Sequence, residues 1–211
     1  MKYEEKLPEL GSQDHLQFGS YIHRIFELGV SATTYQELED ISESLKGTYT
    51  FGEEFHRKTK TCIKNFLRFN SSLRHTISTE YKFELDIGDD IIFNGIIDRI
   101  LKSPTDEFLI IDYKTGKNEK SRTDLFNDLQ MQSYAFAIHK LYNVPYNKIT
   151  VAHYYPLTDK LVDIRYQSWQ IAAFERALTK DCWAIRKAKK TELKPNQNKF
   201  CNWCGYKDKC P

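Results

Sequence analysis

The first third of the chain carries apolar residues at the three- to four-residue spacing of amphipathic helices. A first helix is predicted over residues 13–30, on a stripe made of Leu16, Ile22, Ile25 and Phe26. A second helix is predicted to begin at Thr34 and to run to Leu45, because Thr34 and Glu37 have the spacing of a capping box. A third helix follows on a stripe made of Phe55, Cys62, Ile63, Phe66 and Leu67. The pattern therefore predicts a helical N-terminal part over residues 1–75.

The pattern then changes from helical spacing to alternation. Apolar and polar residues alternate over residues 77–87, which is typical of a half-buried strand. A second strand is predicted over 91–101, interrupted at Asn94-Gly95, and a third over 108–113. The third strand is apolar enough to be buried on both faces.

Helices and strands alternate in the rest of the chain. A helix is predicted over 124–142, a hairpin over 148–155 and 161–166, and a long helix from Ser168 onward, with Pro195 ending the regular structure. This order predicts an α/β fold in which helices flank a mixed central β-sheet. We expect one domain over residues 1–195 and a cysteine-rich tail over residues 196–211 that packs on it.

Composition and charge place few limits on function. A chain of 211 residues with 40% hydrophobic residues can build one compact core. The net charge is only +2, but ten Lys or Arg stand against three Asp or Glu between Arg176 and Pro211. Such a basic end can contact phosphates, although a solvated tail is the commoner explanation. With no apolar stretch near the ~18–20 residues of a membrane span and no signal peptide at the N-terminus, a cytoplasmic protein without membrane contact is expected.

Two carboxylates and a lysine lie near the ends of two predicted strands. Asp112 and Lys114 are two positions apart at the end of the third strand, so their side chains project on one face. Asp98 lies near the end of the second strand, and the two carboxylates can converge if these strands pair. Magnesium and manganese prefer such oxygen ligands, and a neighbouring lysine can orient or deprotonate a metal-bound water. A salt bridge at a strand end is the alternative.

These residues resemble the PD-(D/E)XK nuclease superfamily in its RecB-like branch, which includes helicase-linked exonuclease domains, CRISPR-associated adaptation nucleases and many phage exonucleases. The resemblance runs from about residue 16 to the C-terminus. The order and spacing of its motifs are together more specific than any single motif. The matching positions are His23 within residues 19–23, Glu80, Asp98, the run Asp112-Tyr113-Lys114, and the pair Gln130 and Tyr134. Each position alone also has a structural explanation, such as a core histidine for His23 or a polar helix edge for Gln130.

The resemblance implies a restriction-endonuclease-like core and a magnesium- or manganese-dependent deoxyribonuclease. The metal ligands would be His23, Asp98, Asp112 and the Tyr113 carbonyl, with Glu80 assisting. Lys114 would activate the water, while Gln130 and Tyr134 would contact DNA. An exonuclease acting on single-stranded DNA or DNA ends is favoured, in replication, recombination or repair, in a bacterial or phage-infected cell. A structure-specific endonuclease and a non-catalytic DNA-binding module are the alternatives. Because no helicase-type phosphate loop occurs, any motor is expected to be a separate helicase or recombination protein.

The C-terminus carries a second candidate site. Cys201, Cys204 and Cys210 have the spacing C-x2-C-x5-C, which lets thiolates bind one metal ion or cluster, and an odd cysteine count without a signal peptide argues against a disulfide framework. The motif resembles the C-terminal cysteines of iron–sulfur members of the same branch, which implies a 4Fe–4S cluster, with zinc as the alternative. Those members have a fourth cysteine near the N-terminus, and here none precedes His23. Four possibilities remain for the fourth ligand, which are Cys62, Cys182, a residue outside the sequence, or no residue. Packing in the hydrophobic core is the alternative role for Cys62 and for Cys182.

Overall fold

The fold is an α/β arrangement built around one β-sheet. The computed structural model describes residues 14–88, 90–187, 197, 198, 201, 204 and 207. The N-terminal helices are α1 (Asp14–Leu28), α2 (Tyr35–Leu45) and α3 (Glu54–Ser72), and the strands β1 (Thr76–Asp86), β2 (Ile92–Lys102) and β3 (Phe108–Tyr113) follow. After β3 come α4 (Arg122–Phe126), α5 (Leu129–Tyr142), the 3-10 helix η1 (Tyr146–Lys148), β4 (Ile149–Tyr155), β5 (Lys160–Ile164) and α6 (Ser168–Lys187).

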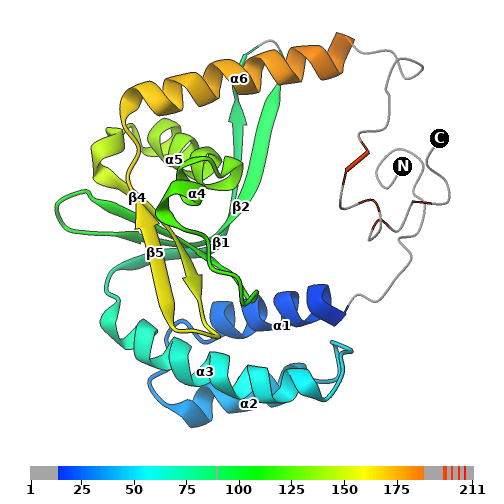
Figure 1. The fold of residues 1–211 in the computed structure, drawn as a ribbon. Helices are drawn as coiled ribbons and strands as arrows, with labels where there is room; N and C mark the ends of the chain where they lie inside the picture. The colour runs from blue at the N-terminus through cyan, green and yellow to red at the C-terminus, as the bar shows by residue number, and fades with distance from the viewer. Residues whose placement is uncertain are drawn as a thin grey trace.

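The five strands form a mixed sheet in the order β1-β2-β3-β4-β5. All neighbouring pairs are antiparallel except β3 and β4, which are parallel. The crossover between β3 and β4 carries α4 and α5 across one face of the sheet, and α6 lies on the same side, whereas α1, α2 and α3 cover the opposite face (Figure 1). This arrangement confirms the predicted α/β class with helices flanking a mixed sheet.

Each face of the sheet carries its own hydrophobic core. Ile110 belongs to the core beneath α5 and α6, while the next residue, Ile111, belongs to the core beneath the N-terminal helices. In the latter core, the rings of Phe26 and Phe66 stack with centroids 3.9 Å apart, and both rings contact Tyr113 edge-on. The prediction that β3 is buried on both faces is therefore confirmed, and the end of β3 is anchored by aromatic packing.

The helix predicted over residues 124–142 is wrong as a single element, because the chain forms two helices there. Ser121 caps α4 in a capping box with Asp124. The Asp128 carboxylate then accepts the backbone N–H groups of Gln130 and Met131, at 2.8 and 3.1 Å, and so begins α5. This second cap places Gln130 in the first turn of α5. The capping box predicted at Thr34 is present at the start of α2.

The interruption predicted at Asn94-Gly95 is also wrong, because β2 runs unbroken from Ile92 to Lys102. Gly95 is needed for packing instead. It lies opposite Phe83 on β1, and a Cβ atom at this position would come within 2.7 Å of the Phe83 ring. A glycine in a strand often marks such a close approach.

The predicted boundary between residues 195 and 196 lies outside the described residues, as does Cys210. Cys201 and Cys204 are free thiols in the part of the chain that the structure describes, and the predicted iron–sulfur site stays a prediction. Within the described ranges, none of the helices combines the length and the apolar character needed to cross a membrane.

Candidate active site

Four ionisable residues lie at matching positions on four neighbouring strands. Asp112 on β3 is in register with His153 on β4. Asp98 lies opposite Asp112, because each is one residue beyond the last pair of β2 with β3. Glu80 falls at the position on β1 that faces Asp98. The register of the sheet therefore brings together residues that are far apart in the sequence.

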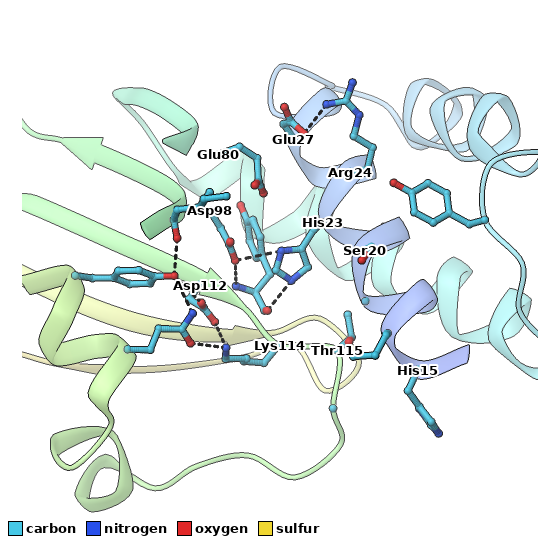
Figure 2. A pocket seen from close by; sticks show the side chains of 18 residues that line it. His15, Ser20, His23, Arg24, Glu27, Glu80, Asp98, Asp112, Lys114 and Thr115 are labelled. Atoms are coloured by element: carbon cyan, nitrogen blue, oxygen red, sulfur yellow. Dashed lines mark hydrogen bonds and ion pairs between the residues drawn. The ribbon is translucent and has the colours of Figure 1, made fainter. Parts of the chain in front are cut away.

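Helix α1 contributes an imidazole to this row. His23 points from α1 toward Asp98 (Figure 2), with its Nδ1 3.4 Å from Asp98 Oδ2 and its Nε2 2.9 Å from the Tyr113 carbonyl oxygen. The same Asp98 oxygen accepts the Tyr113 backbone N–H at 2.7 Å. Burial lowers the pKa of His23. The hydrogen bond to Asp98 and the charges of Asp98 and Asp112 raise this pKa by more than burial lowers it, so the net shift is upward. His23 and Asp98 thus enclose the end of β3.

Potential metal ligands gather at this point. One ligand atom from each of His23, Glu80 and Asp98 lies within 4.8 Å of the others. Glu80 adopts a left-handed backbone conformation, with φ of 46°, which is uncommon for a residue with a side chain. Burial, and next the charge of Asp98, raises the pKa of Glu80. Strained backbone of this kind clusters at functional sites.

A chain of hydrogen bonds holds Lys114 against Asp112. The Lys114 backbone N–H donates to the Tyr154 carbonyl at 2.9 Å, which extends the β3–β4 ladder by one residue. Its Nζ lies 2.6 Å from Asp112 Oδ2 and donates to Gln130 Oε1 at 2.8 Å. Gln130 Nε2 in turn donates to the Tyr134 hydroxyl at 2.8 Å. The first two turns of α5 therefore orient the ammonium group of Lys114.

Tyr134 connects this chain to β2. Its hydroxyl donates to the Ile96 carbonyl at 2.7 Å and lies 3.4 Å from Asp112 Oδ1. Asp112 itself is only 1% exposed. Burial and the charge of Asp98 raise the pKa of Asp112 to about 6, although Lys114 acts in the opposite direction. Lys114 therefore stabilises the charged form of Asp112 only in part, and a further cation would stabilise it more.

These residues open onto a cleft of about 690 Å³ between α1, the sheet and α5. All eight residues that the sequence placed at a nuclease site line this cleft: His23, Glu80, Asp98, Asp112, Tyr113, Lys114, Gln130 and Tyr134. Cys201 and Cys204 are not among the lining residues, and Cys210 lies outside the described part of the chain.

The charge of the cleft bears on what it can bind. Four carboxylates line it, those of Glu27, Glu80, Asp98 and Asp112, together with the cations Arg24 and Lys114. Arg24 is paired with Glu27 at 2.6 Å. A polyanion would therefore meet an excess of negative charge here, unless a bound cation reversed it.

Two buried polar residues near the site were not predicted from the sequence. His153 is fully buried beside Asp112. A signal was present, because a single histidine interrupts the apolar strand ITVAHYY. Arg99 is 2% exposed and donates two hydrogen bonds to Thr76 Oγ1, at 3.0 and 2.7 Å.

A sheet flanked by helices, with carboxylates and a lysine gathered at the ends of its central strands, is the architecture of a nuclease family. A sequence profile of the PD-(D/E)XK nuclease superfamily matches residues 1–211, and the chain belongs to this superfamily. The family resemblance inferred from the sequence is therefore confirmed.

Known relatives agree with this membership. The chain is 25% identical over 168 residues to one of the subunits of the ATP-dependent helicase/deoxyribonuclease of Streptococcus pyogenes serotype M1, and equally to its counterpart in serotype M49 strain NZ131. The match covers 69% of this chain, which spans only 15% of either relative. A crystal structure of a protein from Eubacterium rectale, provisionally assigned as an exonuclease, superposes with a TM-score of 0.58 at 15% identity, covering 96% of this chain and 77% of that one. This structure supports the fold.

Proposed function

We propose that this protein is a metal-dependent DNA nuclease that hydrolyses phosphodiester bonds in the cleft between α1 and α5. The observation that carries the proposal is that His23, Asp98 and Asp112 line one cleft with a lysine that is held in place by hydrogen bonds. Membership of the nuclease superfamily supports the reaction class.

The donor set fits magnesium or manganese. Asp98, Asp112 and the Tyr113 carbonyl offer the oxygen ligands that these hard cations prefer, and Glu80 can assist from β1. His23 adds an imidazole, which suits manganese better than magnesium. When bound, the ion would polarise the scissile phosphate and lower the pKa of a water molecule.

Lys114 and the first turns of α5 complete the proposed chemistry. The ammonium group of Lys114 can orient the attacking water or neutralise charge that develops on the phosphate. Gln130 and Tyr134 hold Lys114 through their hydrogen bonds. Gln130 is exposed, so its amide can also contact the DNA backbone.

The proposed substrate is single-stranded DNA or a DNA end, cleaved as an exonuclease. The names of the relatives support this choice, since one group belongs to a helicase/deoxyribonuclease and the similar structure is provisionally assigned as an exonuclease. The name of the curated relatives supports a helicase as a partner that supplies single-stranded DNA. Structure-specific endonuclease activity would use the same residues and is an outcome of the experiment below.

The experiment compares end-labelled linear single-stranded DNA with circular single-stranded DNA, in magnesium, in manganese and in EDTA. We expect digestion of linear DNA that requires a metal ion and is lost in Asp112→Asn. Cleavage of the circle would instead establish an endonuclease. If the parent protein binds DNA but leaves both substrates intact in manganese, the chain is a binding module and the proposal fails.

The cysteine tail adds a 4Fe–4S cluster to the proposal, held by Cys201, Cys204 and Cys210. Cys62 is a poor fourth ligand, because it is fully buried among apolar residues and burial raises the pKa of its thiol to about 12, whereas metal binding needs a thiolate. Iron and acid-labile sulfide are measured in protein purified without oxygen, beside Cys201→Ala. Zinc in place of iron would support the alternative, and the absence of both metals would refute a metal site.

A further inference from the structure

His153 is a buried polar residue that the proposed chemistry does not use. Its side chain is fully buried in β4 and lies in register with Asp112. Its Nε2 is 3.8 Å from Asp112 Oδ2 and forms no hydrogen bond within the described part of the chain. An unpaired polar atom in a protein interior is unfavourable and calls for an explanation.

The hydrogen bonds on the other side of the ring are compatible with a proton on Nε2. The Tyr155 hydroxyl accepts the backbone N–H of Lys120 at 2.9 Å and lies 3.2 Å from His153 Nδ1. When this hydroxyl donates its single proton to Nδ1, His153 carries its own proton on Nε2, the nitrogen that faces Asp112. An imidazole with a proton on Nε2 can donate one hydrogen bond toward Asp112 Oδ2.

We infer that His153 is a positioning residue for Asp112, an inference that rests on the nuclease function proposed above. Lys114 Nζ lies 2.6 Å from Asp112 Oδ2, the same oxygen that His153 Nε2 faces. At 3.8 Å, His153 is too far from this oxygen to donate a hydrogen bond while Lys114 is in place. When substrate draws Lys114 away, His153 is the donor that stays beside Oδ2. Carboxylates that bind metal ions depend on such hydrogen-bond partners for their orientation.

Tyr155 extends this support to the segment that follows β3. Its contact with the Lys120 backbone ties residues 114–121 to the ring of His153. The position of this segment and the orientation of Asp112 are thereby coupled through two buried side chains.

The test measures manganese binding by titration calorimetry on full-length variants, separately from cleavage. His153→Leu removes the donor, and we expect its Kd for manganese to rise by about 10- to 100-fold. In His153→Gln the side-chain amide can reach the position of Nε2, so we expect a change within about threefold. At low manganese concentration, the cleavage rate should fall in step with the metal affinity. At saturating manganese, kcat should be close to the parental value in both variants.

Two further variants separate a positioning role from a structural one. His153→Asn retains a polar group near Nδ1 but lacks the donor toward Asp112, and it replaces His153→Leu if that variant does not fold. Tyr166→Phe is the control for losing a buried polar group away from the cleft. It deletes a hydroxyl whose hydrogen bond to the Leu125 carbonyl measures 2.8 Å, and Tyr166 does not line the cleft.

The outcomes distinguish this inference from the function on which it rests. Parental manganese affinity in folded His153→Leu or His153→Asn would overturn the inference, and so would equal weakening in His153→Gln. If Asp112→Asn loses manganese binding while His153→Leu keeps it, only the role of His153 fails. If Asp112→Asn binds manganese as tightly as the parent, the proposed metal site fails and the inference fails with it.

Discussion

Two positions on β3 are equally buried but carry opposite kinds of side chain. Ile110 is 0% exposed in an apolar core, and Asp112, two residues later on the same strand, is 1% exposed. Burying an isoleucine stabilises the fold, whereas burying a carboxylate opposes folding unless a partner compensates. The raised pKa of Asp112 shows that Lys114 compensates only in part. Equal burial therefore serves stability at one end of the strand and, in the proposed function, metal binding at the other.

The largest expected effect is on activity at the acidic end. Lys114→Met should lower kcat by about 10²- to 10⁴-fold, the range typical of losing a general acid–base group, because no other cation is held against Asp112 among the residues that line the cleft. Single-turnover cleavage of labelled DNA measures this loss. Lys140→Met is the matched control, since Lys140 lies in the last turn of α5 and pairs with Glu175. Equal activity of the two variants would contradict the proposed role.

The next effect is on stability at the apolar end. Ile110→Ala should lower the free energy of unfolding by about 2–5 kcal/mol, because it leaves a cavity in a closely packed core. Urea denaturation in EDTA measures the loss. A change below about 1 kcal/mol would mean that the core relaxes around the cavity and that this end of β3 is less tightly packed than its burial indicates.

Asp112→Asn should change stability in the opposite direction. The folded-state pKa of Asp112 is raised to about 6 from an ordinary value of 3.8, so its contribution to stability is complete below pH 4 and is lost as the pH rises through 6. Without metal, the asparagine variant should therefore exceed the parent at pH 8 by about 1–3 kcal/mol, with the difference shrinking toward pH 4. Urea denaturation in EDTA at the two pH values tests the sign. A variant less stable than the parent at pH 8 would show that the Asp112–Lys114 pair stabilises the fold overall.

The smallest effect concerns the backbone at the edge of the acidic row. Because Glu80 has a positive φ, Glu80→Gly should be more stable than Glu80→Ala by about 1 kcal/mol. At the neighbouring Thr79, which belongs to the regular ladder with β2, the order should reverse, because glycine weakens an ordinary strand. Thermal unfolding of the four variants compares the two positions. If the glycine and alanine variants rank in the same order of stability at both positions, the backbone at Glu80 is not strained.

Local patterns in the sequence determined most of the elements. Helical spacing, alternation and the cap at Thr34 depend on neighbours within a few residues, so they can be recognised from the sequence alone. The pairing of Asp112 with Lys114 on one strand end was likewise predictable from a spacing of two residues. The single helix predicted over 124–142 failed because its hydrophobic pattern continues through the junction, whereas the Asp128 cap restarts the helix there.

The tertiary structure alone decided how the site is assembled. Strand order and register depend on contacts between residues far apart in the sequence, and they place Glu80, Asp98, Asp112 and His153 in one row. The left-handed conformation of Glu80 and the position of Gly95 against Phe83 also depend on the neighbouring strand or helix. The sequence by itself thus determined which residues can do chemistry, and the packing of the sheet between its two helical layers determined which of them meet.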